Sequence, residues 1–102
     1  MSQYLLHGKL TAKLGHKDEL AKLMLEASIL MTKAKGCILY IVGLGKNDVN
    51  SVYITEIWET EQDHDESLNY SGVRELIKKV MPILEEMPKK GQEINILGGK
   101  GV

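Results

Sequence analysis

Alternation of apolar and polar side chains predicts a strand near each end of the chain. Between residues 3 and 13 most apolar or small side chains fall on one side, and His7 and Lys9 fall on the other. A strand with one covered face and one polar face is the expected result. Residues 92–97 are predicted to form the last strand, before a glycine-rich end.

Two longer segments carry apolar residues at helical spacing. In residues 17–34 and 73–87 the apolar positions recur every three or four residues, which predicts two amphipathic helices. Gly36 is expected to end the first helix as its C-terminal cap residue. Pro82 lacks an amide hydrogen, so it is expected to bend the second helix, which should stop before Pro88.

The middle of the chain predicts a hairpin and a short helix. Cys37–Leu44 is a continuous apolar run rich in β-branched and aromatic residues, which is typical of a strand buried on both faces. After turn residues at 45–50, residues 51–70 predict a strand that leads directly into a short acidic helix. Thr60 is the expected N-cap of that helix, with Asp63 three residues further on.

The order of these elements is strand, helix, strand, strand, helix, strand. It predicts an α+β fold of the ferredoxin-like βαββαβ type, with a four-stranded antiparallel sheet and helices on one face. The other face would expose more apolar surface than a monomer usually tolerates, since Cys37–Leu44 is apolar on both sides. A homodimer through this open sheet face is the simplest way to cover it.

Composition narrows the range of partners. The 102 residues are enough for one domain spanning 1–102, and their net charge is -1 with lysines and arginines spread along the chain. Without a basic stripe, neither nucleic acid nor an anionic membrane is an expected partner. Because the start of the chain lacks a secretion signal pattern, no segment is apolar enough to span a membrane, and Cys37 is the single cysteine, we expect a cytoplasmic protein.

Four segments of the chain form a recognisable set: G-H-K-D-E-L-A-K-L-M-L-E-A, K-G-C-I-L-Y-I-V, V-Y-I-T-E-I-W-E-T-E-Q-D-H and V-M-P-I-L. In their order and spacing they resemble the antibiotic biosynthesis monooxygenase superfamily, including its quinol monooxygenases. The third is similar to the E-x-W strand and acidic short helix of that family. The resemblance implies a dimeric α/β barrel, in which two sheets pack face to face. It also implies cofactor-independent oxidation of a small aromatic or quinol-like compound with O₂.

Histidine positions depart from the family pattern. Many catalytic members carry a histidine in the short helix and often a second in the following turn, and here those positions hold Ser67 and Gly72. The nearest imidazole is that of His64, one helical turn earlier. The haem-degrading subgroup has a histidine at the position of Leu68 and an asparagine in the first strand, so haem chemistry is not expected here.

Oxygenation without a cofactor needs an electron-rich substrate, a base and an apolar pocket that admits O₂. The catalytic candidates are His64 as the base, Trp58 as a flat wall for an aromatic ring, and Tyr70 as a hydrogen-bond donor. The predicted substrate-binding residues are Tyr40, His7, Leu68 and Glu56. No cofactor is expected, and the sequence lacks C-x-x-C, H-E-x-x-H and H-x-x-x-H spacings and the glycine motifs of nucleotide sites.

The same residues also have purely structural interpretations. A lone Trp58 is typical of a core anchor, and His64 among acidic neighbours is typical of an exposed imidazole. His7 also fits a hydrogen-bonded interface residue, and Cys37 fits a buried, unreactive thiol. The catalytic pairing therefore requires one apolar cavity that reaches both Trp58 and His64. The alternative functions are a non-catalytic small-molecule-binding or stress-related dimer and a cofactor-free isomerase.

Overall fold

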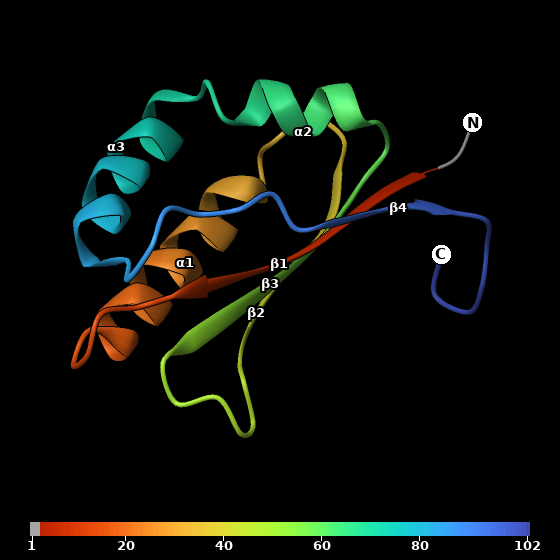
Figure 1. The fold of residues 1–102 in the computed structure, drawn as a ribbon. Helices are drawn as coiled ribbons and strands as arrows, with labels where there is room; N and C mark the ends of the chain where they lie inside the picture. The colour runs from red at the N-terminus through yellow and green to blue at the C-terminus, as the bar shows by residue number, and fades with distance from the viewer. Residues whose placement is uncertain (1–2) are drawn as a thin grey trace.

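The computed structural model describes residues 3–102, which form a four-stranded antiparallel sheet with helices on one face (Figure 1). The elements are β1 (Gln3–Thr11), α1 (Lys17–Met31), β2 (Cys37–Leu44), β3 (Ser51–Trp58), α2 (Glu61–Ser67), α3 (Ser71–Val80), the 3-10 turn η1 (Met81–Ile83) and β4 (Gln92–Ile96). The strands lie in the order β2-β3-β1-β4. This arrangement confirms the predicted ferredoxin-like α+β fold. No helix among residues 3–102 has the length and apolar character needed to cross a membrane.

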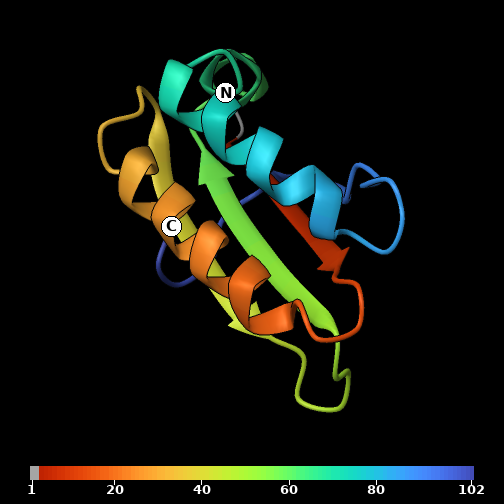
Figure 2. The ribbon, with the colours of Figure 1, turned by 90° about the vertical axis from the view of Figure 1, so that its left-hand side faces the viewer.

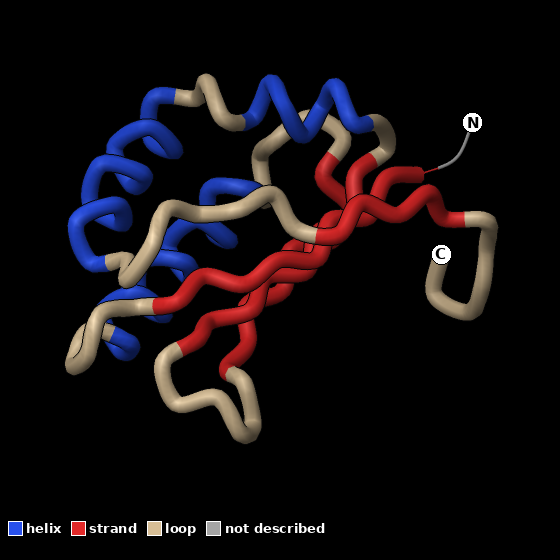
Figure 3. Tube along the Cα trace, viewed as in Figure 1, coloured by secondary structure: helices blue, strands red, loops and turns tan. Residues whose placement is uncertain are grey.

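β1 lies in the middle of the sheet, but β4 pairs with only part of its edge. The pairing with β3 runs along nearly all of β1, whereas the pairing with β4 ends at His7. The rest of this edge is spanned by residues 84–91, which connect η1 to β4 and are named here the connecting segment (Figure 3). A hydrogen bond of 2.8 Å from Glu85 N to Thr11 O holds the start of this segment to β1.

Gly91 allows the connecting segment to rejoin the sheet. A Cβ atom on Gly91 would collide with the β1 backbone at His7 and Gly8. A larger residue must therefore push the segment away from β1 just before β4 begins. Because the segment contacts β1 at both ends and departs from it in between, a cleft opens between them.

Side chains on the helix-covered face of the sheet form a core of two clusters. One cluster includes the fully buried Leu20 and Val52, and the other includes Tyr4 and Trp58. Tyr40 of β2 packs against both. α1 and α3 lie over this face (Figure 2), and a cavity lies where the two clusters meet.

α1 is shorter than the sequence predicts. It ends at Met31 with Thr32 as its C-cap, and the next residues continue in tighter turns, such as the hydrogen bond of 3.1 Å from Ala34 N to Met31 O. The prediction of Gly36 as the cap residue is wrong: Gly36 stands directly before β2, with φ of 80°. A Cβ atom there would collide with Asp63, so this glycine allows α2 to pack against the turn.

The break at Pro82 is larger than predicted. α3 begins at Ser71 and ends at Val80, and Pro82 lies in the 3-10 turn that follows. The predicted helical continuation to residue 87 is wrong, because Leu84 is extended and forms an isolated bridge with Ala12. Pro82 cannot donate to a helical ladder, and pairing with the chain beyond β1 then replaces the helix.

The sheet face opposite the helices is uncovered in the single chain. Ile41 of β2 is 53% exposed on this face, which is the face that the sequence predicts a partner subunit to cover. Ile94 of β4 is half exposed, and the strand register places it on the same open face. Helices cover only the other side, so the dimer through this face stays a prediction.

Candidate active site

A partly enclosed cavity lies between the helices and the sheet. Its volume is about 250 Å³, larger than the roughly 150 Å³ of an apolar cavity that holds benzene. Most of its wall is apolar: Leu10, Met24, Ala27, Met31, Leu68, Val73, Leu76, Ile77, Val80, Met81, Leu84 and Pro88. The polar side chains in the wall are Tyr40, Glu56, His64 and Ser67. The cavity suits a planar, mostly apolar molecule of one or two rings.

The cavity continues outward into a wider cleft. The cleft has a volume of about 450 Å³ and shares Tyr40, Glu56 and His64 with the cavity. Its outer wall is formed by β1 and by residues 88–91 of the connecting segment. A ligand that enters between β1 and this segment therefore reaches the polar side chains directly.

α2 places His64 in the cavity wall. Thr60 caps this helix as predicted, because its Oγ1 accepts a hydrogen bond of 3.0 Å from Asp63 N. His64 then lies on the side of α2 that faces β3, and its ring meets that of Trp58 edge-on at 5.7 Å between centroids. Only 7% of His64 is exposed. The interpretation of His64 as an exposed imidazole is wrong, because acidic residues such as Glu66 occupy the outer side of the helix instead.

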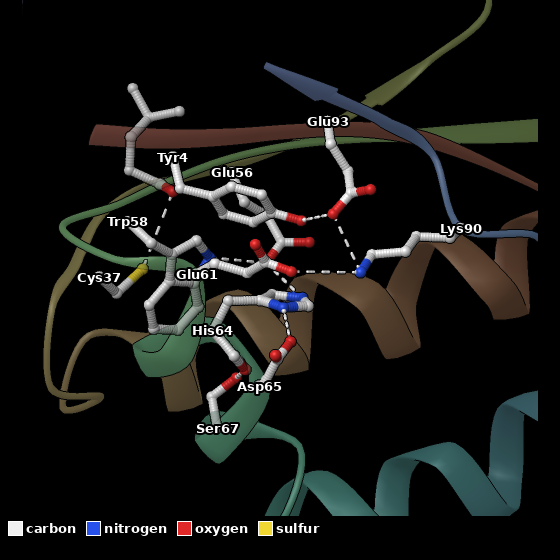
Figure 4. A network of polar contacts seen from close by, with 11 residues as sticks. Tyr4, Cys37, Glu56, Trp58, Glu61, His64, Asp65, Ser67, Lys90 and Glu93 are labelled. Atoms are coloured by element: carbon white, nitrogen blue, oxygen red, sulfur yellow. Dashed lines mark hydrogen bonds and ion pairs between the residues drawn. The ribbon is translucent and has the colours of Figure 1, made fainter. Parts of the chain in front are cut away.

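The two ring nitrogens of His64 face different carboxyl groups. Nδ1 lies 3.0 Å from Asp65 Oδ1, and Nε2 lies 3.8 Å from Glu56 Oε1 (Figure 4). An ionised carboxylate only accepts hydrogen bonds, so Nδ1 of the neutral imidazole carries the proton and donates a hydrogen bond to Asp65. Nε2 then keeps its lone pair on the side of Glu56 and the cavity. A general base is commonly arranged in this way: Asp65 orients the ring through Nδ1, and Nε2 is left to accept a proton.

Glu56 lies in the cavity wall beside Trp58, and its side chain is only 12% exposed. The indole Nε1 donates a hydrogen bond of 2.9 Å to Glu56 Oε1. Burial raises the pKa of the Glu56 carboxyl group, and the hydrogen bond from Trp58 and the nearby His64 offset part of that rise. Glu56 therefore holds its proton to a higher pH than a free glutamate does.

Tyr40 and Leu68 complete the group of predicted residues that meet at the cavity. Burial, with a smaller effect from Glu56, raises the pKa of the Tyr40 phenol, which therefore stays neutral and is able to donate a hydrogen bond. Leu68 follows α2 and lines both the cavity and the cleft. The structure thus brings His64, Glu56, Tyr40 and Leu68 together.

Trp58 supports this group from behind. It is fully buried in the core and is not part of the cavity wall, so it does not provide a flat surface for a substrate ring. The cavity that the catalytic pairing requires reaches His64 and does not reach Trp58. The indole contacts the imidazole and holds Glu56, so Trp58 is a core anchor that positions two polar residues of the site.

Tyr70 and His7 lie away from the cavity. Tyr70 precedes α3 at the surface, and its hydroxyl accepts a hydrogen bond of 3.4 Å from Lys35 N. His7 is on the open face of the sheet, where its Nδ1 lies 2.9 Å from Thr55 Oγ1 and its ring stacks on that of Tyr53. The structure does not bring either side chain to the other predicted site residues.

Asp65 is a site residue that the sequence reasoning missed. It directly follows His64, and neighbouring residues on a helix point about 100° apart, so adjacency gave no reason to pair them. Its side chain is 57% exposed and reaches back to Nδ1 from the outer side. The only sign of Asp65 in the sequence was that acidic residues flank His64 on both sides.

A cluster of charged side chains borders the cleft and was also missed. Lys90 Nζ lies 3.0 Å from Glu93 Oε1 and 3.7 Å from Glu61 Oε2, and the Tyr4 hydroxyl donates a hydrogen bond of 2.9 Å to Glu93 (Figure 4). Lys90 and then Tyr4 hold the pKa of Glu93 below its usual range. The Tyr4 ring also lies 5.9 Å from that of His64, so the cluster borders His64.

Another potentially reactive group is the thiol of Cys37. Cys37 is half-buried, and its thiol lies 3.8 Å from the carbonyl oxygen of Leu39. Burial raises the pKa of this thiol, which fits the predicted unreactive cysteine. Within residues 3–102 no three His, Cys, Asp or Glu side chains come together as metal ligands would.

The sequence also matches the model of a protein family. The family model described as antibiotic biosynthesis monooxygenase matches residues 3–79. The chain belongs to the antibiotic biosynthesis monooxygenase family. Tyr40, Glu56 and His64 fall within the part that matches, whereas residues 88–91, which form the outer wall of the cleft, lie beyond it. The family pattern therefore includes the polar groups of the cavity but not the segment past which a ligand enters.

Solved structures of similar fold include proteins that carry the same family name. A protein from Chloroflexus aurantiacus J-10-fl that carries the family's name has 29% identity and a TM-score of 0.85, over 98% of both chains. One of the same family name from Nitrosomonas europaea has 12% identity and a TM-score of 0.88, over 94% of this chain and 91% of that chain. A conserved protein of unknown function from Bacteroides thetaiotaomicron VPI-5482 has 13% identity and a TM-score of 0.81, over 93% and 98%. The last two show the fold alone. No protein of curated function matches the sequence.

Proposed function

We propose that this protein is a cofactor-free oxygenase that oxidises a small aromatic, quinol-like compound with O₂. The supporting observation is the cavity wall, which is apolar except for Tyr40, Glu56, His64 and Ser67. Of these four, only Glu56 and His64 belong to residue types that ordinarily change charge between about pH 4 and pH 8. A site of this kind suits a substrate that is apolar except for a hydroxyl group that a base can ionise.

In this proposal His64 is the general base. Nε2 takes the proton of a substrate hydroxyl group, and Asp65 stabilises the resulting imidazolium at Nδ1. The phenolate that forms is electron-rich and reduces O₂ directly. One oxygen atom enters the ring and the other leaves as water, so the substrate itself supplies all four electrons. The apolar wall admits O₂ and keeps water from the reactive intermediate.

We further propose that two copies of the chain associate through the open sheet face. The half-exposed Ile41 and Ile94 support this, because a partner sheet would remove them from water. His7 lies on the same face and would then be a hydrogen-bonded interface residue. The family resemblance implies the same face-to-face packing of two sheets.

A proton-transfer isomerase is the second candidate, and the pairing of Glu56 with His64 favours it. A carboxyl group that holds its proton and an imidazole with a free lone pair are able to act as acid and base on one substrate. Such a reaction needs no O₂. Oxygen dependence therefore separates the two candidates, and a non-catalytic binding protein would show neither reaction.

Oxygen uptake by the purified protein with a panel of hydroquinones and polycyclic phenols tests the proposal. We expect at least one compound to raise uptake above its autoxidation rate, and His64→Ala to lower the protein-dependent part by about 10²-fold or more. His16→Ala is the matched control, because His16 pairs with Glu19 at the exposed start of α1. Uptake at the autoxidation rate for every compound would refute the oxygenase. Conversion of a compound under nitrogen would favour the isomerase.

A further inference from the structure

Glu56 lines the cavity with part of its hydrogen-bonding capacity unused. Within residues 3–102 its side chain forms one hydrogen bond, in which Trp58 Nε1 donates to Oε1. Because Trp58 is fully buried, this bond holds Glu56 from the side away from the cavity. Oε2 has no hydrogen-bond partner among these residues, and Glu56 lines both the cavity and the cleft. Its position is therefore fixed while it remains accessible to a ligand.

Burial favours the neutral form of Glu56 and outweighs the opposite effects of Trp58 and His64. Tyr40 and Cys37 face it from β2, and burial raises the pKa of both, so neither carries a charge. His64 faces it from α2, with Asp65 on the far side of the imidazole. The residues of α1 and α3 in the cavity wall are apolar. Since the cavity wall contains no lysine or arginine, burial prevails and raises the pKa of the carboxyl group.

The distance between Glu56 and His64 leaves room for one ligand atom. Oε1 and Nε2 are 3.8 Å apart, which is too long for a direct hydrogen bond. A ligand hydroxyl oxygen bound between the two side chains would accept a hydrogen bond from the Glu56 carboxyl group and donate one to Nε2. Oε2 is free to carry the carboxyl proton, because Trp58 donates to Oε1. A phenol bound there has a proton acceptor on one side, at Nε2, and a carboxyl group on the other.

We propose that Glu56, in its protonated form, donates a hydrogen bond to the substrate oxygen that His64 deprotonates, and that it stabilises the phenolate. The inference rests on the proposed function and names a second catalytic residue for it. The hydroxyl proton moves to His64 Nε2, and the Glu56 proton stays on the carboxyl group, so one proton is transferred. An ionised Glu56 in the same place would repel the phenolate.

The chemistry of phenols explains why such a donor is needed. A phenol has an ordinary pKa of about 10 and an imidazole of about 6.5, so proton transfer between them in water is unfavourable by roughly 3,000-fold. A hydrogen bond donated in a site of low polarity stabilises the phenolate more than the phenol. A neutral carboxylic acid in an apolar site performs this role in ketosteroid isomerase. Glu56 and Trp58 provide the corresponding donor and its support.

Ionisation of bound 4-nitrophenol tests this proposal without any oxygen chemistry. Its neutral and ionised forms absorb at different wavelengths, and the electron-poor ring resists oxidation. We expect the bound probe to ionise at a lower pH than the free probe in the wild type. Glu56→Gln should keep this shift, because its amide oxygen accepts from Trp58 Nε1 while its NH₂ group donates to the probe. Glu56→Ala should lose most of it.

The matched control is Glu59→Gln, which removes a carboxylate from an exposed position just after β3 and should leave the shift unchanged. Trp58 fluorescence and thermal unfolding check that each variant is folded. Equal behaviour of Glu56→Gln and Glu56→Ala, or no shift in the wild type, would overturn the proposal. A normal shift without oxygen uptake from any hydroquinone would refute the oxygenase and leave the role of Glu56 in place.

Discussion

Replacing Glu56 by glutamine is predicted to stabilise the fold by an amount that grows with pH. Burial raises the pKa of this carboxyl group in the folded protein above its value of about 4.3 in the unfolded chain. Between these two pKa values the folded state binds more protons, so the free energy of unfolding falls as the pH rises through the interval. One group contributes at most about 1.4 kcal/mol per pH unit. Glutamine has nearly the same shape and does not ionise. The free energy of unfolding of Glu56→Gln therefore does not fall in this way as the pH rises.

Thermal unfolding of the wild type, Glu56→Gln and Glu59→Gln from about pH 4 to pH 8 measures this effect. For a domain of this size about 1 kcal/mol shifts Tm by 4–8 °C, so the advantage of Glu56→Gln should grow by several degrees with pH. The protein concentration must be fixed, because association also changes Tm. Glu59→Gln gives the effect of removing an exposed charge. An advantage that stays constant or shrinks with pH would refute the reasoning, since Glu56 would then be ionised beside a cationic His64.

Three further substitutions test the N-cap of α2, the path of the connecting segment and the proposed dimer. Thr60→Ala should lower the free energy of unfolding by about 1 kcal/mol, because it removes the N-cap of α2. Thr60→Ser keeps a capping hydroxyl group and should not lower it, and urea unfolding measures both variants. Gly91→Ala should cost about 1–3 kcal/mol in the same assay, because its Cβ collides with β1. Gly8→Ala should cost less, because its Cβ meets Gly91 only at an ordinary contact of 3.7 Å, and equal losses would contradict this. Ile41→Lys should convert a dimer to a species of 11.4 kDa in sedimentation, and a wild type already of that mass would refute the dimer.

The fold was predictable because its signals are long and agree with one another. The apolar stripe of α1 and the alternation in β1 extend over whole elements, and the turns between them carry glycine or polar residues. The errors lie where a contact distant in sequence decides the structure. Leu84 leaves the helical pattern because it meets Ala12, more than seventy positions earlier in the chain.

The site was predictable where its residues are close in the sheet or in the chain. Tyr40 and Glu56 are cross-strand partners of the central hairpin, and α2 follows directly after β3, so a likeness to the E-x-W strand pointed to all of them. The burial of His64 was not predictable, because a helix of seven residues is too short for an apolar stripe. The cluster at Lys90 was not predictable either, since it depends on the path that Gly91 allows.

In the proposed reaction, His64 takes the part of the family histidine that this chain lacks at Ser67. Residues three apart on a helix are neighbours on its surface, and both His64 and Ser67, where the family resemblance places a histidine, are buried and line the cavity. Ser67 Oγ donates a hydrogen bond of 2.6 Å to the His64 carbonyl oxygen, so the buried hydroxyl group finds its partner within its own helix. Three residues span about 4.5 Å along the helix axis, and this displacement brings the imidazole to Trp58 and Glu56 at the end of β3. The proposed reaction therefore takes place beside β3, where Glu56 lies within reach of the same substrate oxygen.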